Sequence, residues 1–248
     1  MISHQVEIIE KKWLSSDTFS FEFYLKGIAP GPGQFFQVQV NESYDPILNR
    51  PISIASYKNN RVMLIIKVAG KGTENLSKKE PGDRLMIFGP FGKKLKINKK
   101  KRSLFVAGGI GVAPLYFLAQ VLYSRRTDFT FIYGAKYPED IILKTEINQL
   151  SHKTIFITEY GNKKKGTALS VLKELDLSKY DICYTCGPKA MLRELKLMNL
   201  NIPVYAFCED FLGCGCGLCL GCAIKYYGEY KRICEDGPVF ELEGIEFD

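Results

Sequence analysis

Four of the chain's eight cysteines fall within nine residues, in the segment CGCGLCLGC at positions 214–222. Cys214, Cys219 and Cys222 are spaced C-x4-C-x2-C, and Cys234 follows after eleven further residues. This is the ligand spacing of plant-type [2Fe–2S] clusters, which are held by four thiolates. The glycines between these cysteines let the backbone wrap closely and direct amides at sulfur. The spacing predicts a cluster site with these four cysteines as ligands.

Two other metal centres fit parts of the same segment. A [4Fe–4S] cluster would use Cys216, Cys219 and Cys222, which are spaced C-x2-C-x2-C, but the Cys-Pro expected next in bacterial runs is missing. Zinc sites with four cysteines usually consist of two C-x2-C pairs separated by a longer spacer, whereas three candidate ligands share one loop here. Cys216 therefore stays ambiguous, and we expect Cys208 to be structural.

Two glycine-containing loops in the middle of the chain follow apolar strands. FVAGGIGVAP (105–114) combines a strand, a glycine loop and a proline at the first turn of a helix, although Pro114 replaces the third glycine of G-x-G-x-x-G. TCGPKAM (185–191) ends a later strand. Open parallel sheets bind nucleotides at such positions. Cys183 is expected in the core, and Cys186 either lines a nicotinamide site or is buried. The candidate nucleotide-contacting residues are Gly108, Gly109, Gly111, Cys186, Gly187 and Pro188.

Two motifs in the first hundred residues could hold an anionic cofactor. In RPIS (50–53), the planar guanidinium of Arg50 suits a pyrophosphate, and the Ser53 hydroxyl could reach a flavin ring nitrogen. The alternative is an ordinary strand entrance whose arginine faces solvent. In AGKGTENLS (69–77), Gly72 and Thr73 stand where a helix begins, so that backbone amides could form an anion pocket. The alternative is a glycine-rich turn with a threonine cap.

The elements that must position these residues change character along the chain. Residues 6–97 hold short alternating segments separated by Pro, Gly and Asn, a pattern typical of a barrel or sandwich. From about residue 102, apolar runs alternate with helical stretches, which predicts βαβ units and a parallel sheet. The last segment is rich in Cys and Gly and too small to fold without a metal centre. We expect domains at residues 1–100, 101–205 and 206–248.

Charge and composition narrow the function class. The formal charge is +7, but the basic run from Lys93 to Arg102 has no interleaved aromatic residue for base stacking, so we expect a solvated connection and no nucleic acid. No signal peptide or membrane span is present in the sequence, which predicts a cytoplasmic protein whose clustered cysteines are metal or redox groups. Only His4 and His152 occur, which excludes a histidine-based catalytic site. Transfer of a hydride or of single electrons between cofactors requires that the protein position the cofactors, and it does not require a protein acid or base. The shortage of histidine therefore fits a redox protein.

Taken in order, the motifs point to a family. RPIS, GKGT, GGIGVAP, CGP and a terminal C-x4-C-x2-C…C that closes in CEDGPVF resemble the electron-transfer subunits of class 1B dihydroorotate dehydrogenases, within the ferredoxin–NADP reductase superfamily. The resemblance covers essentially the full length. It implies a six-stranded antiparallel β-barrel that binds FAD, a parallel-sheet domain that binds NAD, and a small C-terminal [2Fe–2S] domain.

The resemblance also implies roles for residues and a partner. NAD would approach the Gly108–Pro114 loop and the Cys186–Pro188 turn. Electrons from dihydroorotate, which an FMN-containing catalytic subunit would oxidise to orotate, would pass through the cluster and FAD to NAD+ in pyrimidine biosynthesis. The resemblance implies a heterotetramer of two of each subunit. Related subunits serve ferredoxin–NADP oxidoreductases and sulfhydrogenases. A zinc-stabilised binding module is the remote alternative. The residues that would bind FAD are Arg50, Pro51, Ile52, Ser53, Ile65, Ile66, Lys67, Gly72 and Thr73.

Overall fold

The computed structural model describes residues 2–41, 45–97, 101–151, 153–161 and 165–247, so His152 and the centre of the basic run lie outside the described residues. The chain folds as two compact units. We call them the barrel unit (Met1–Leu95, Glu209–Ile224 and Tyr230–Pro238) and the sheet unit (Lys96–Cys208, Lys225–Glu229 and Val239–Asp248). Among the described residues, no helix is both long and apolar enough to span a membrane.

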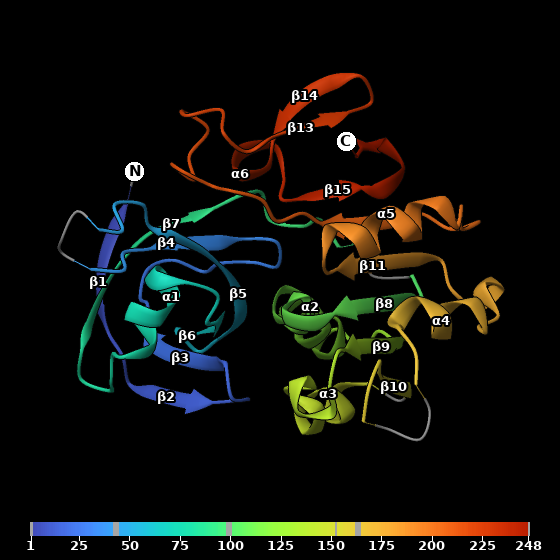
Figure 1. Cartoon of the computed structure of the whole chain (residues 1–248), viewed down its shortest axis with the longest axis horizontal. Coiled ribbons are helices and arrows are strands. Elements are labelled where there is room, and N and C mark those ends of the chain that lie inside the picture. Colours follow the sequence, from blue (N-terminus) through green and yellow to red (C-terminus); the bar gives the residue numbers. More distant parts are fainter. Residues whose placement is uncertain (1, 42–44, 98–100, 152, 162–164, 248) are drawn as a thin grey trace. The chain divides into compact units, whose positions relative to one another are not determined.

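The barrel unit is built on an antiparallel sheet with the strand order β1-β7-β4-β5-β6-β3-β2 (Figure 1). A short helix, α1, lies between β6 and β7 in the sequence. The elements are β1 (Ser3–Glu7), β2 (Glu10–Trp13), β3 (Thr18–Tyr24), β4 (Phe35–Val38), β5 (Arg50–Lys58), β6 (Arg61–Lys67), α1 (Lys71–Ser77) and β7 (Arg84–Phe91).

The two edge strands, β1 and β2, are consecutive in the chain and close the sheet. The Ile8 amide donates to the Asp83 carbonyl oxygen at 2.9 Å, whereas the next amide, of Ile9, donates to Glu22 of β3 at 2.8 Å. The bent segment therefore switches from the β7 side to the β3 side, and the sheet curls on itself without a long free edge. If β1 and β2 are counted as one bent strand, the barrel has six strands, as expected. The predicted antiparallel barrel is confirmed.

Aromatic side chains at alternate positions fill the interior of the barrel. Phe19, Phe21 and Phe23 of β3 are completely buried, and the Phe23 ring packs edge-on against Phe36 of β4 with centroids 6.4 Å apart. Alternation along a strand sends every second side chain to the same face. The same rule places Gln37, between Phe36 and Val38, on the outer face of β4.

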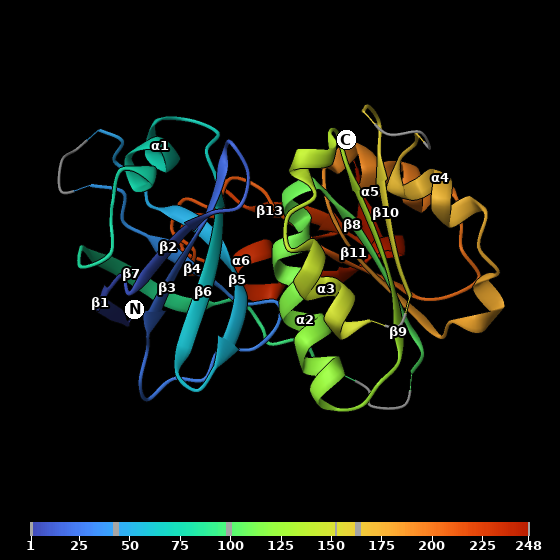
Figure 2. The ribbon, with the colours of Figure 1, turned by 90° about the horizontal axis from the view of Figure 1, so that it is seen from below.

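The sheet unit contains a six-stranded sheet with the order β10-β9-β8-β11-β12-β15, in which β15 alone is antiparallel. Helices α2 and α3 cover one face, and α4 and α5 cover the other (Figure 2). This parallel-sheet prediction is confirmed. The elements are β8 (Ser103–Gly108), α2 (Val112–Ser124), β9 (Phe129–Ala135), α3 (Lys144–Leu150), β10 (Lys153–Thr158), α4 (Ala168–Lys173), β11 (Ile182–Cys186), α5 (Lys189–Leu197), β12 (Val204–Phe207) and β15 (Val239–Glu241).

Burial on both faces explains the continuous apolar runs of the central strands. All six residues of β8 are buried, and the Phe105 ring stacks on Phe131 of β9 with centroids 5.2 Å apart. On β11, Thr185 is buried and its hydroxyl donates to the Val106 carbonyl oxygen at 2.9 Å. Parallel strands covered by helices on both sides read as uninterrupted hydrophobic segments.

The C-terminal stretch is shared between the two units. Its cysteine-rich part belongs to the barrel unit, whereas its last ten residues belong to the sheet unit, where β15 pairs with β12 through Glu241 opposite Tyr205. A small sheet has the order β14-β13-β16; β13 and β14 lie between Cys222 and Cys234 in the sequence, and β16 lies after Cys234. The remaining elements are β13 (Ala223–Tyr226), β14 (Glu229–Arg232), α6 (Ile233–Asp236) and β16 (Ile245–Glu246).

Candidate functional site

The expected FAD segments lie at neighbouring strand ends that diverge from each other. Strand β5 pairs with β6 only from Ile54, opposite Leu64, onward. Residues 50–53 pair on their other side with β4, and residues 65–67 pair with β3. The edges of these two segments that face each other therefore have no ladder partner among the described residues. Backbone groups at such edges need another hydrogen-bonding partner, which a bound ligand can supply.

The side chains of these segments differ in what they offer. Ile52, Ile65 and Ile66 are buried, so their contribution to a ligand is mainly backbone. Ser53 is half-buried, and Phe35 of β4 stands directly opposite it. Lys67 is exposed at the end of β6 and forms an ion pair with Asp17 at 3.1 Å.

Arg50 lies against the first turn of α1. A Cβ added to Gly72 would come within 2.5 Å of the Arg50 Nε, so glycine is what lets the guanidinium approach the helix backbone. The Arg50 Nη1 donates to the Leu48 carbonyl oxygen at 2.6 Å. The Thr73 hydroxyl oxygen accepts from the Ala69 amide at 2.9 Å and fixes the turn. The first amides of a helix lack intrahelical acceptors, so the Arg50 guanidinium and the first amides of α1 place several hydrogen-bond donors side by side, as the predicted anion site requires.

The four predicted cluster cysteines form two pairs of thiols. The sulfurs of Cys222 and Cys234 are 3.3 Å apart. The Cys214 thiol interacts with the Cys219 thiol and also with that of Cys216, and the Cys219 backbone amide donates to the Cys214 sulfur at 3.4 Å. The Gly217 amide donates to the Cys234 sulfur at 3.1 Å. Four thiols in two pairs fit a two-iron centre, with one pair for each iron.

A single metal ion fits this arrangement less well. Among the described residues, no group of three or more His, Cys, Asp or Glu side chains converges as one ion requires. A zinc site would need four donors around a common centre at about 2.3 Å from the metal. The donors present are thiols, which are the ligands of iron–sulfur clusters, and backbone amides already point at two of the sulfurs. The residues present therefore fit the predicted cluster.

The protonation of the cysteines follows from these contacts. Burial opposes ionisation of Cys214, but the backbone amides of Cys219 and Cys216 outweigh it and lower the pKa of Cys214 to about 6. Burial and the neighbouring Cys222 thiol raise the pKa of Cys234 to about 12. Burial and the Cys214 thiol also raise the pKa of Cys216. Because metal ligation requires thiolates, Cys214 already favours the ligating form, whereas Cys234 would have to release its proton to solvent on ligation.

The cluster loop, residues 212–222, is fixed to the barrel by contacts that sequence reasoning missed. The Gln37 Nε2 donates to the Leu212 carbonyl oxygen at 2.7 Å. The segment after Cys234 is attached to the barrel as well, because the Lys93 amide donates to the Gly237 carbonyl oxygen at 2.6 Å. A lone glutamine in a strand carries no motif, so nothing in the sequence marked Gln37 as a contact to a loop 175 residues away.

The two predicted nucleotide loops meet in the sheet unit. The chain runs from β8 to β9 and β10 on one side and returns to β11 and β12 on the other, so the strand order reverses between β8 and β11. Open parallel sheets bind ligands at the carboxyl ends of strands at this reversal. A Cβ on Gly111 would overlap the Cys186 carbonyl oxygen, and a Cβ on Gly108 would lie 3.1 Å from Pro188. The structure thus brings both glycine-containing loops together.

Two cysteines of strand β11 were predicted from the sequence, and three further residues near the carboxyl edge of the parallel sheet were not. Cys186 and Cys183 are buried, and burial raises the pKa of Cys183 to about 12, as fits a core thiol. Met191 was missed, although its sulfur would lie 2.7 Å from a Cβ on Gly108. Tyr137 and Tyr160, which follow β9 and β10, were also missed; their rings are 5.4 Å apart. Two exposed tyrosines separated in the sequence give no recognisable spacing.

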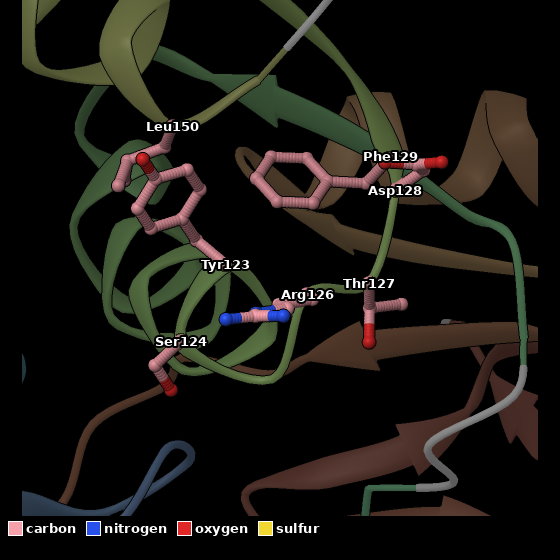
Figure 3. Close-up of a pocket in the computed structure, with 7 residues that line it drawn as sticks. All are labelled: Tyr123, Ser124, Arg126, Thr127, Asp128, Phe129 and Leu150. Carbon is pink, nitrogen blue, oxygen red and sulfur yellow. The ribbon is translucent and has the colours of Figure 1, made fainter.

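A cavity of about 420 Å³ lies elsewhere in the sheet unit, between the end of α2 and the start of β9. In Figure 3, Tyr123 and Leu150 stand on one side of it and Phe129 on the other. It opens at the amino end of β9, whereas the nucleotide loops follow the carboxyl ends of the strands. None of the expected site residues lines this cavity, whose lining residues are Tyr123, Ser124, Arg126, Thr127, Asp128, Phe129 and Leu150.

Family models match three consecutive parts of the chain. Residues 5–95 match an oxidoreductase FAD-binding domain, and residues 105–196 match an oxidoreductase NAD-binding domain. Residues 209–246 match the iron–sulfur cluster binding domain of dihydroorotate dehydrogenase B. The chain thus has FAD-binding, NAD-binding and iron–sulfur domains, which confirms the predicted cofactors and disfavours zinc.

Solved structures with the same fold include an NADH-dependent reduced ferredoxin–NADP oxidoreductase. That chain is 27% identical, with a TM-score of 0.88, and the match covers 97% of this chain and 89% of that one. Phthalate dioxygenase reductase, 21% identical with a TM-score of 0.67 over 85% of this chain and 70% of that one, shares the fold.

Curated relatives match over nearly their full length. The dihydroorotate dehydrogenase B (NAD(+)) electron transfer subunit of Caldanaerobacter subterraneus subsp. tengcongensis is 32% identical over 98% of both chains. That of Desulforamulus reducens is 37% identical over 92% of both. With the three domain matches, these relatives show that the chain belongs to the family of dihydroorotate dehydrogenase B electron transfer subunits.

Proposed function

We propose that this chain transfers electrons between a dihydroorotate-oxidising catalytic subunit and NAD+ in pyrimidine biosynthesis. The observation that carries the proposal lies in the barrel unit. There, a paired set of four thiols and the divergent strand ends expected to bind FAD belong to one compact body. One unit would therefore hold both the iron–sulfur cluster, which carries single electrons, and the flavin. This arrangement suits electron transfer within one subunit.

We assign three functional domains on this basis. They are residues 1–100 for FAD, 101–205 for NAD and 206–248 for the cluster, although the last segment is shared between the two structural units. The proposed FAD ligands are residues 50–53, 65–67, 72 and 73. The anion corner formed by Arg50 and the first turn of α1 would hold the pyrophosphate, and Ser53 would face the flavin ring. The proposed NAD contacts are Gly108, Gly109, Gly111, Cys186, Gly187 and Pro188.

We assign a [2Fe–2S] cluster to Cys214, Cys219, Cys222 and Cys234. The two thiol pairs support this nuclearity. The C-x4-C-x2-C spacing leaves Cys216, whose thiol also interacts with Cys214, as a non-ligand. When bound, the flavin exchanges electrons one or two at a time and the cluster exchanges them singly. The protein's own contribution is to hold both groups and to direct the amides of residues 216, 217 and 219 at the thiolates, which stabilises their negative charge.

The partner would dock at the cluster loop. Leu218 and Leu220 expose 81% and 62% of their surface there, and Cys219 is exposed between them. Phe211, directly before the loop, exposes 90%. Exposed apolar side chains gathered on one loop mark protein interaction sites. We propose that an FMN-containing catalytic subunit covers this loop in a cytoplasmic heterotetramer of two of each subunit.

A second candidate is a subunit of a ferredoxin–NADP oxidoreductase. The full-length structural likeness to the NADH-dependent enzyme of that type favours it. The two candidates share the cofactors and differ in the partner and in the substrate that supplies the electrons.

The test is to purify the native assembly and record its visible and EPR spectra before and after NADH or dihydroorotate is added. We expect flavin and [2Fe–2S] signals, reduction by both compounds, and recovery with an FMN-containing subunit. Recovery with a ferredoxin-reducing subunit, together with no response to dihydroorotate, would support the second candidate. A preparation that binds neither FAD nor iron after reconstitution would contradict both.

A further inference from the structure

Gln37 is a buried polar residue on the outside of the barrel. It exposes 1% of its surface, although its neighbours Phe36 and Val38 are the ones that point into the barrel. On β5, the residue directly opposite it is Pro51, in the segment proposed to bind FAD. Directly opposite residues of an antiparallel pair project from the same face. Gln37 therefore shares a face with Pro51 and with Ser53, which lies two residues further along β5.

The cluster loop covers Gln37. Its Nε2 donates to the Leu212 carbonyl oxygen at 2.7 Å, two residues before Cys214. On the other side of that cysteine, Gly215 has a φ of +75°, and a Cβ there would lie 2.7 Å from the Gln37 Cγ. Glycine is needed at this position both for the backbone conformation and for the close approach. One side chain of β4 thus contacts the loop on both sides of a proposed cluster ligand.

The carboxamide is poorly explained by stability alone. The Gln37 Oε1 is buried and has no hydrogen-bond partner among the described residues. Leaving a buried acceptor unpaired costs stability, and an apolar side chain of similar size would fill the space without that cost. By contrast, both ends of the buried Gln34 amide are bonded, to Gly31 and Gly92. A polar group kept at a cost beside a cofactor loop points to a functional role.

We propose that Gln37 is a positioning residue that sets the cluster loop in register with the flavin-binding strand β5 and thereby controls electron exchange between flavin and cluster. This inference rests on the proposed function. The Nε2 bond holds the backbone before Cys214, and the contact with Gly215 holds the backbone after it. Loss of the bond would let the Cys214 end of the loop shift while β5 stays paired with β4.

The experiment compares Gln37→Leu with Gln39→Leu in the full chain loaded with FAD and cluster. Gln39 is the matched control, because it lies two residues further along the chain from Gln37 and its Nε2 donates to the nearby Asn41 carbonyl oxygen, at 2.9 Å. Stopped-flow mixing with NADH separates flavin reduction from cluster reduction. EPR of the reduced cluster and its midpoint potential report on the cluster itself.

We expect Gln37→Leu to keep its FAD content, its melting temperature and its rate of flavin reduction by NADH. Cluster reduction should slow several-fold, because the rate of electron transfer falls steeply as the distance between flavin and cluster increases. The midpoint potential or EPR line shape should change as well. Gln39→Leu should match the wild type in every measurement. Loss of the cluster from Gln37→Leu alone, with FAD retained, supports the same role.

Two results would overturn the inference. One is wild-type EPR, potential and cluster reduction in Gln37→Leu, and the other is equal loss of the cluster from both variants. Either can occur while the wild-type chain transfers electrons normally, so the inference can fail without the proposed function. If the wild-type chain itself binds no flavin or cluster, the proposed function fails first.

Discussion

The cluster loop and the nucleotide loops both depend on glycine, but for different purposes. In the cluster loop, Gly215 and Gly217 have φ values of +75° and +82°, and the conformation they allow turns amides toward sulfur. In the nucleotide loops, Gly108 and Gly111 let two backbone segments touch. The cluster loop is therefore shaped to receive a metal centre, whereas the nucleotide loops are set by packing within the sheet unit.

Because of this difference, we expect substitutions in the two regions to have different effects on ligand binding and on the stability of the fold. The chemistry of the cluster loop is carried by thiols, which can be changed one at a time without disturbing the barrel strands. The chemistry of the nucleotide loops is carried by backbone that is part of the packing. Substitutions should therefore remove the ligand and leave the fold in the first region, and damage both in the second.

The largest effect is expected from Cys234→Ala. Removing one of the four proposed cluster ligands should abolish the reduced-cluster EPR signal and lower the bound iron and sulfide to background, while FAD content stays at the wild-type level. Iron, sulfide and flavin analysis of the purified protein measures this. Cys216→Ala is the control and should keep the cluster. A cluster retained in Cys234→Ala and lost in Cys216→Ala would favour the C-x2-C-x2-C register instead.

The next largest effect is expected from Gly111→Ala. Its Cβ would overlap the Cys186 backbone, which cannot move as a side-chain end can. Overpacking of this kind costs about 1–3 kcal/mol, so the free energy of unfolding should fall by that amount and the KM for NADH should rise. Chemical denaturation and NADH titration measure the two effects. Gly70→Ala, which would meet no atom within 4 Å, is the stability control. Unchanged stability in Gly111→Ala would be evidence against packing as the role of this glycine.

Gly72→Ala tests whether the FAD site behaves like the cluster loop, where a substitution should remove the ligand and leave the fold, or like the nucleotide loops, where it should damage both. The added Cβ would displace the end of the Arg50 side chain, which is flexible, so the barrel should stay stable. Loss of the proposed contact between Arg50 and the pyrophosphate should raise the FAD dissociation constant by about tenfold, equivalent to about 1.4 kcal/mol. Fluorescence titration with FAD measures this, and the melting temperature of the apo protein checks the fold. A large drop in that melting temperature would place the FAD site with the nucleotide loops.

The smallest effect is expected at the start of β8. The Arg102 guanidinium lowers the pKa of Asp181 from its ordinary value of 3.8, and Asp181 also accepts from the Arg102 amide at 2.7 Å. A carboxyl whose pKa is lower in the folded state stabilises the fold above its unfolded pKa, and this stabilisation is lost as the pH falls through the folded pKa. Asp181→Asn should therefore slightly lower stability at neutral pH and flatten its fall below about pH 4. Denaturation at a series of pH values measures the slope; an unchanged slope would show that this pair does not contribute.

The spacing of residues within short segments made the order of the domains and most of the candidate site motifs predictable from the sequence. The C-x4-C-x2-C run, the order of barrel and parallel sheet, and the two glycine-containing loops are properties of short segments, and strand and helix periodicity acts over the same range. The RPIS and GKGT segments were also visible, but that Arg50 lies on Gly72 depends on how β5 and α1 pack. Met191 and the pair Tyr137 and Tyr160 could not be found, because their partners are distant in the sequence.

The sequence by itself determined which chemical groups the protein carries and in what order, since ligand types and their spacing are fixed by covalent connection. Tertiary structure alone decided that the cysteine loop joins the barrel unit through Gln37, that the last residues add β15 to the parallel sheet, and that β1 and β2 close the barrel. These contacts join residues far apart in the chain. Their positions depend on the packing of whole elements, which no local pattern encodes.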